Sequence, residues 1–185
     1  MKKHFSSFVK DIIPVIVGIL IALFINNWNE DRKERAYLDD ILVSINQELE
    51  ETHQDIDTIM SLQYALIDTL MVYLEDEKTS VQTIMEKANG VSIPTIRIHS
   101  WKALSNSRIE LLAYEDLSNL ASIEEDKTIL MEKSKYLMNF LYNNISETKR
   151  RSKAMLIGLL NELIGSENSI LNEINEMNQR YKSDR

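Results

Sequence analysis

The sequence contains no cysteine and has only four glycines and two prolines in 185 residues. The absence of cysteine excludes disulfide bonds, thiolate metal ligands and cysteine nucleophiles. The glycines stand at positions 18, 90, 158 and 165. Their spacing excludes a glycine-rich phosphate loop and a Gly-x-Ser-x-Gly nucleophile motif. So few turn-forming residues also favour long helices.

Residues that carry chemistry are sparse as well. The three histidines, His4, His53 and His99, lack the spacing of a zinc site. His53 and Asp57 are four residues apart and would share a helix face, but no third ligand accompanies them, which favours a solvated surface pair. Acidic runs at 48–51 and 124–126 are typical of hydrated helix faces. We therefore expect no catalytic, cofactor-binding or metal site, and no enzyme.

The charge is unevenly distributed along the chain. The formal net charge is −8, with +2 on residues 1–28 and −10 on residues 29–185. Phosphate contacts need a basic surface, so the acidic part makes nucleic acid an unfavourable partner.

One long apolar run dominates what is present. Residues 12–25 carry no charge, and a strongly polar stretch follows at 26–33. Phe8 and Val9 extend the run upstream, and Trp28 suits the headgroup depth of a bilayer. The resulting segment, residues 8–28, would span roughly 30 Å as a helix, enough to cross a membrane once.

Two alternatives to a membrane anchor have to be weighed. Lys2, Lys3 and Lys10 with a short apolar core resemble a cleavable signal peptide, but the bulky residues 24–28 offer no small-x-small cleavage site. A buried helix of a soluble protein is the other alternative. We predict an uncleaved signal anchor over residues 1–28.

The charges flanking the segment do not fix its orientation. Three basic residues stand on each side of it. The free N-terminal amine and the lysine-rich tail favour an N-terminus inside. We expect a single-pass protein of the bacterial inner membrane, with most of the chain periplasmic or otherwise extracytoplasmic.

A heptad pattern follows the apolar segment, and no glycine or proline interrupts residues 19–89. Eight of its ten seam positions are apolar, which predicts a long amphipathic helix over residues 29–77. The two seams consist of Leu42, Leu49, Ile56, Gln63 and Leu70, and of Ile45, Thr52, Ile59, Leu66 and Tyr73.

That helix could pack inside a bundle of the same chain or form a coiled-coil stalk between copies. The apolar surface widens beyond Ile59, which favours the bundle. Gly18 and Ala22 form a small-xxx-small pair that allows close approach of another membrane helix, so a protein partner or a homo-oligomer is expected.

Residues 78–185 continue the helical pattern. A capping box at 79–82, a helix ending near Gly90 and a short helix capped by Ser100 are predicted, with an extended segment at 91–98 where Pro94 disfavours a central strand. Helices are expected at 109–121 and 123–164, with a break at Gly165 and a last helix after it. The fold class is all-α, with the membrane helix continuing into an antiparallel bundle of four or five helices.

Two further segments stand out. The basic cluster 149–153 is typical of an exposed helix turn, with anionic lipid or an acidic partner as the alternative. The apolar segment 155–164 is too short to span a membrane and favours core packing over a partner-facing surface.

The N-terminal motif resembles a known family. Residues 18–23 (GILIAL), 25–30 (INNWNE) and Arg32-Lys33 are similar to the signature of a family of uncharacterised bacterial single-pass membrane proteins. Here Lys10-Asp11 replaces the family's usual Gly-Glu, and Phe24 replaces a common Gln. The resemblance implies one N-terminal span and no assigned activity.

Two functions are compatible with these observations. The first is a membrane-anchored helical scaffold or protein-interaction module of the bacterial envelope. The second is an extracytoplasmic ligand-sensing bundle that acts through a partner. An exposed apolar groove would favour the first, and a cavity with convergent buried polar groups would favour the second.

Overall fold

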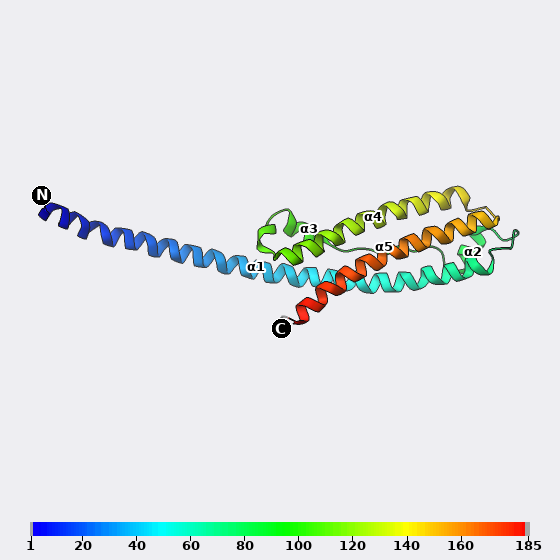
Figure 1. The fold of residues 1–185 in the computed structure, drawn as a ribbon, viewed down its shortest axis with the longest axis horizontal. Helices are drawn as coiled ribbons and strands as arrows, with labels where there is room; N and C mark the ends of the chain where they lie inside the picture. Colours follow the sequence, from blue (N-terminus) through cyan, green and yellow to red (C-terminus); the bar gives the residue numbers. More distant parts are fainter. Residues whose placement is uncertain (1, 184–185) are drawn as a thin grey trace. The chain divides into compact units, whose positions relative to one another are not determined.

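The chain is all-α in a computed structural model, which describes the backbone of residues 2–183 and the side chains of residues 13–180. Five α-helices and one short 3-10 helix occur, and no strand is found in this described backbone (Figure 1). The chain divides into two compact units, Met1–Val43 and Ser44–Arg185, called here the N-terminal unit and the bundle unit. The predicted all-α bundle is confirmed.

Helix α1 spans Lys2–Val72 and includes Pro14. The unit boundary falls inside it. The predicted long helix is therefore confirmed, but it ends before residue 77. Beyond Val72 the backbone turns, because the amide of Leu74 and that of Asp76 each bond to a carbonyl only three residues earlier, at 3.3 and 3.2 Å.

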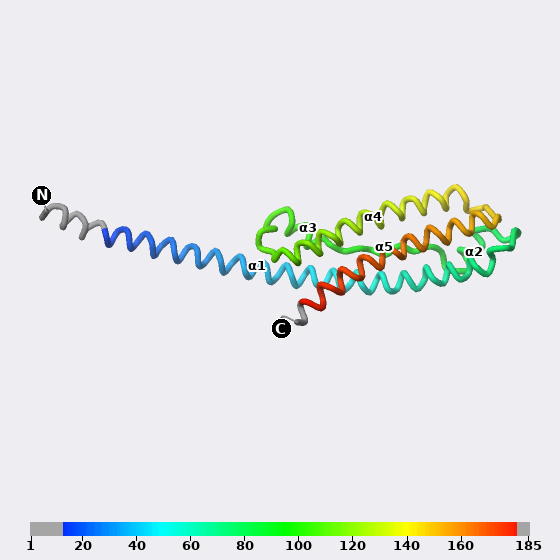
Figure 2. The backbone as a smooth tube through the Cα atoms, viewed as in Figure 1, coloured from blue at the N-terminus to red at the C-terminus, as the bar shows by residue number. Residues whose placement is uncertain are grey.

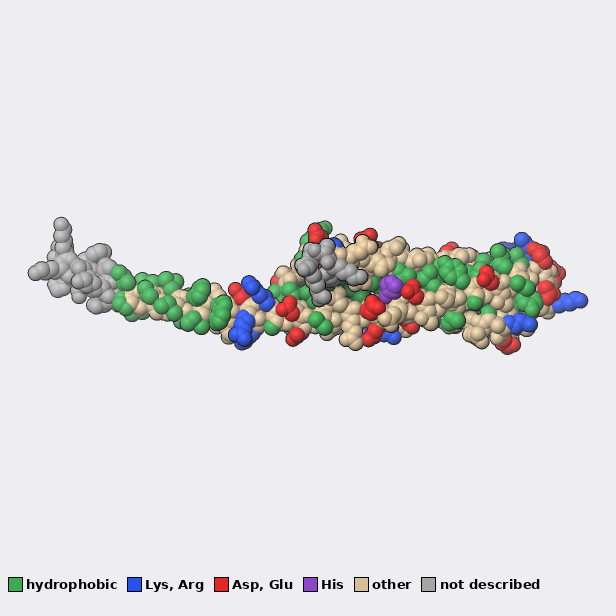
Figure 3. Space-filling model, turned by 90° about the horizontal axis from the view of Figure 1, so that it is seen from below, with side chains coloured by type: hydrophobic (Ala, Val, Ile, Leu, Met, Phe, Trp, Pro, Cys, Tyr) green, Lys and Arg blue, Asp and Glu red, His purple; other side chains and the backbone are tan. Residues whose placement is uncertain are grey.

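The N-terminal unit exposes its apolar side chains. Those of residues 13–30 are all exposed, including Phe24 at 72%. Figure 3 shows this apolar stretch followed by charged side chains. Among the described residues, α1 is the one helix long and apolar enough to cross a membrane. The side chains of residues 8–12, the start of the predicted bilayer segment 8–28, lie outside the described residues.

In the bundle unit, the heptad of α1 forms much of the core. Its buried seam residues include Leu49, Ile56, Leu66 and Leu70. Ile59, predicted to be buried, is only half-buried, so the seam is narrower there than expected.

The residues that cap the short helices α2 (Val81–Lys87) and α3 (His99–Ser105) differ from those predicted. Ser80, not Thr79, caps α2 by accepting a bond of 3.2 Å from the amide of Thr83. The amide of Ser100 is bound by the carboxylate of Glu48 at 3.0 Å, so a distant side chain satisfies the start of α3.

The segment 91–98 between α2 and α3 is extended, as predicted, and runs back along α1. Hydrogen bonds join Gln63 to Ser92, Asp55 to Thr95 and Glu48 to Ser100. In these pairs the residue number in α1 falls as the residue number in the segment rises, so the segment runs antiparallel to α1 (Figure 2).

Two long helices complete the bundle unit after the 3-10 helix Ile109–Leu111: α4 (Tyr114–Asn144) and α5 (Arg150–Ser183), which pack side by side. Two predicted breaks, after residue 121 and at Gly165, are absent, and the break after Asn144 was not predicted. Helix α4 starts before residue 121 and stops at Asn144, and α5 passes through Gly165 without interruption. The predicted α4 stripe Leu130, Leu137 and Leu141 is buried, whereas Ile145 lies beyond the helix and is 37% exposed.

Candidate functional site

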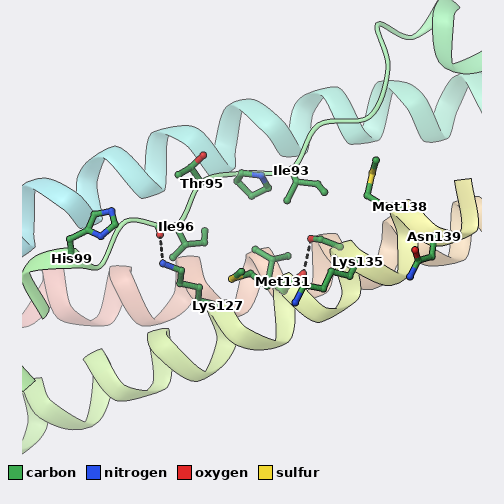
Figure 4. A pocket seen from close by; sticks show the side chains of 12 residues that line it. Ile93, Thr95, Ile96, His99, Lys127, Met131, Lys135, Met138 and Asn139 are labelled. Carbon is green, nitrogen blue, oxygen red and sulfur yellow. Dashed lines mark hydrogen bonds between the residues drawn. The ribbon is translucent and has the colours of Figure 1, made fainter. Parts of the chain in front are cut away.

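An open groove of about 780 Å³ lies in the bundle unit between the extended segment and α4. Figure 4 shows its twelve lining side chains. Six are apolar and six are polar, and the polar ones are scattered along the groove. The twelve are Ile93, Pro94, Thr95, Ile96, His99, Lys127, Leu130, Met131, Ser134, Lys135, Met138 and Asn139.

Helix α1 holds the first wall of the groove in place. The amide of Thr95 donates to Asp55 Oδ2 at 2.7 Å, and the amide of Arg97 donates to Thr52 Oγ1 at 2.9 Å. Pro94 lacks an amide hydrogen and disfavours helix at the residue before it. The segment therefore stays extended, with two of its backbone donors satisfied by α1 side chains.

The second wall is one face of α4. Leu130 is buried at its base, whereas Met131 and Met138 are 51% and 52% exposed. Lys127 Nζ donates to the carbonyl of Ile96 at 2.8 Å and ties the two walls together. Burial, followed by the nearby Lys102 charge, lowers the pKa of Lys127.

The polar side chains of the groove differ in their surroundings. Thr95 and Ser134 carry its two hydroxyls, and that of Ser134 is buried and donates to the carbonyl of Leu130 at 2.7 Å. Lys135, His99 and Asn139 are exposed. In the described structure no hydrogen bond joins any two of the side chains Thr95, His99, Ser134, Lys135 and Asn139.

A buried polar pair lies elsewhere in the bundle core. Gln63 of α1 donates from Nε2 to Glu167 Oε1 of α5 at 2.8 Å and to the carbonyl of Ser92 at 3.1 Å. Both side chains are at most 1% exposed. Burial raises the pKa of Glu167 to about 7. Gln63 Oε1 and Glu167 Oε2 have no hydrogen-bond partner.

Lys153 of α5 is another buried polar residue, and it contacts the turn that follows α1. Lys153 is fully buried and donates from Nζ to the carbonyl of Tyr73, at 2.8 Å, and to that of Asp76. A cation at the carbonyl end of α1 is favourable to the helix dipole. The basic cluster 149–153 was predicted to be exposed, and for Lys153 that prediction is wrong.

The remaining sequence features fall at separate places. Within 155–164, Leu156, Leu160 and Leu163 are buried, which supports core packing. His53 Nδ1 lies 3.2 Å from Asp57 Oδ2. The described residues hold no group of three ligands that could bind a metal there.

Gly18 belongs to the N-terminal unit, where nothing in the described structure lies within 4 Å of a Cβ built on it. The surface beside Gly18 and Ala22 is therefore open. A contact of these two residues with another helix stays a prediction.

Sequence reasoning did not find the groove. Its signal was present on α4: Met131 and Met138 are seven residues apart and lie next to the buried stripe residues Leu130 and Leu137. Two helical turns separate Met131 from Met138 and Leu130 from Leu137. An apolar strip beside the core stripe is therefore left for other contacts.

Comparison with known proteins adds one similarity. No curated protein and no solved structure matches this chain. The matching family model covers α1 from residue 11 onward, α2, the extended segment and part of α3, but not α4. Over residues 11–102, just under half of its length, the chain is similar to a family of unknown function (DUF6090).

Proposed function

We propose that this chain is a membrane-anchored helical scaffold of the bacterial envelope that holds a protein partner in the groove of its bundle unit. The exposed apolar groove is the observation that carries the proposal, because exposed apolar surface beside polar surroundings is typical of protein-binding sites. The exposed apolar N-terminal part of α1 supports the anchor. The membrane is taken to be the inner one, with the N-terminus inside.

The ligand-sensing alternative has weaker support. It calls for a cavity into which buried polar groups converge. The buried pair Gln63 and Glu167 is not among the residues that line the groove. The two side chains are buried and bond to each other and to the carbonyl of Ser92, which favours a role inside the core.

Site-specific photo-crosslinking in intact membranes tests the scaffold function. A photoreactive residue at Met138, in the groove, is expected to give discrete adducts with another protein. The same residue at Met155, a methionine of similar exposure (44%) on α5, is the matched control and is expected to give none. Equal adducts at both positions, or none at Met138, would contradict the proposal.

A further inference from the structure

We propose that the groove receives an amphipathic helix of a partner protein whose apolar face is flanked by carboxylates. This inference rests on the proposed function and goes further by naming the chemistry of the partner. It is carried by the apolar floor of the groove, its dimensions and the sign of the charge around it.

The apolar part of the groove suits one face of a helix. Met131 and Met138 are half-exposed beside the buried Leu130, and methionine side chains adapt to different apolar partners. The α4 wall runs over residues 127–139, roughly 18 Å at the helical rise. That length accommodates about three turns of a helix, with anchors at i, i+3, i+4 and i+7.

The charge of the groove is opposite to that of the chain. The twelve lining residues include two lysines and a histidine and no carboxylate, although the chain has 29 acidic and 21 basic residues. Lys127 is engaged with the carbonyl of Ile96. Lys135 is exposed and makes no ion pair or hydrogen bond with the described residues. Its ammonium has three donors available for a partner's carboxylate.

The same observations disfavour a symmetric dimer of this chain through the groove. A symmetric contact would place the groove of one copy against the same groove of the other. Lys135 would then face the like charges of its own groove, which is unfavourable.

An acyl chain is also a poor fit. Small-ligand sites typically bury about 70–90% of the ligand surface. Here Met131 and Met138 remain half-exposed, so the groove is open. An open groove suits a helix, because the polar face of the helix stays in water.

Methyl NMR of the full-length chain in nanodiscs of zwitterionic lipid tests the proposal. The eight methionines are labelled with ¹³C at the methyl group and assigned with single Met→Leu variants. The probes are two designed peptides of about 14 residues with the same leucine stripe at helical spacing. One carries Glu beside the stripe and the other carries Lys. Empty nanodiscs correct for binding of the peptides to lipid.

The Glu peptide is expected to shift the methyl signals of Met131 and Met138 and to leave that of Met155 in place. It should bind more tightly than the Lys peptide. Lys135→Glu should weaken binding of the Glu peptide about fivefold and strengthen binding of the Lys peptide, because one exposed ion pair becomes a repulsion. This exchange of preference separates a charge effect from misfolding.

Three results would overturn the inference. In the first, the Lys peptide binds as well as the Glu peptide. In the second, oleate added to the nanodiscs shifts the two methyl signals while neither peptide does. In the third, the signals shift with protein concentration alone, which indicates self-association. If cross-links at Met138 persist in any of these cases, the proposed scaffold function stands and only the acidic-helix partner fails. If they are absent, both fail.

Discussion

At the scale of single residues, buried and part-buried polar side chains join the elements of the bundle unit. Glu48 holds the start of α3, Gln63 joins α1 to the extended segment and to α5, and Lys153 joins the end of α1 to α5. A buried polar group is costly unless it is hydrogen-bonded, so each of these residues favours one arrangement of its neighbours.

Glu167 makes the stability of the bundle depend on pH. Its pKa in the folded protein is about 7, above the ordinary 4.5, because burial disfavours the carboxylate. A raised pKa means that the folded state binds this proton more tightly than the unfolded state. The contribution to stability is therefore fully present below about pH 4.5 and is lost as the pH rises through about 7.

Glu167→Gln is expected to remove this pH dependence and to stabilise the bundle at pH 8. The difference between a pKa of about 7 and 4.5 corresponds to about 3 kcal/mol, an upper bound on the gain. Urea unfolding of the full-length chain in detergent, from pH 5 to pH 8, measures it. Glu162→Gln, at an exposed position on α5, is the control. A wild-type stability that rises between pH 5 and pH 8 relative to Glu167→Gln would contradict the assignment.

Lys153→Met should destabilise the bundle by about 3 kcal/mol. The substitution keeps most of the apolar volume but leaves the carbonyls of Tyr73 and Asp76 without the ammonium, and hydrogen bonds to a charged group contribute about 1.5–3 kcal/mol each. The urea midpoint measures the loss. Arg151→Met, at an exposed position of the same basic cluster, should change it little. Equal effects of the two substitutions would show that Lys153 does not fix the end of α1.

At the scale of elements, the sequence predicted the helices whose signal is local and misplaced those that depend on distant partners. Helix α1 was predictable because its heptad has no breaker. The loop 145–149 between α4 and α5 contains neither glycine nor proline. Its carbonyls at Glu147 and Ile145 accept bonds of 2.9 and 2.8 Å from the amides of Val81 and Gln82 at the start of α2. Such long-range pairing is invisible to a search for local breakers.

Gly165 misled the prediction for the opposite reason. Glycine lowers helix propensity by only about 1 kcal/mol relative to alanine, and tertiary packing overrides such a preference. Leu163 and Ile164 before it and Ser166 and Glu167 after it are all buried. That packing keeps α5 intact through an exposed glycine.

Gly165→Ala should therefore stabilise the protein by about 0.5–1 kcal/mol, because a methyl group at this position meets no atom within 4 Å and the backbone is helical. Gly90→Ala is the contrasting variant. Gly90 has φ +87 after α2, where a side chain is strained, so alanine should destabilise. Thermal unfolding followed by circular dichroism measures both. Loss of stability in Gly165→Ala would point to a break at this position.

At the scale of the whole molecule, the sequence indicated a long apolar N-terminal helix and the helical class but not the groove. The groove depends on how residues 93–99 lie beside α4, and no periodic pattern encodes the position of an extended segment. Its methionines were visible in the sequence, but only the structure shows that they face a second wall.

The anchor itself leads to the last prediction. Residues 13–25 have no core to pack against in the described structure, and exposing so much apolar surface to water is strongly unfavourable. The protein is therefore expected to sediment with membranes and to resist carbonate extraction. Deletion of residues 1–28 should release it into the soluble fraction.

An alkaline phosphatase fusion after Arg185 tests the orientation and is expected to be active, because the enzyme folds only outside the cytoplasm. The even balance of basic residues on the two sides of the segment gives this test its second arm. Replacing Lys2, Lys3 and Lys10 with glutamine removes the basic residues before the segment and leaves three after it, so part of the population should invert. Fusion activity should then fall relative to a variant with Arg32, Lys33 and Arg35 replaced. An inactive fusion on the wild-type chain, with a cytoplasmic reporter active at the same position, would place the bundle unit and its groove in the cytoplasm.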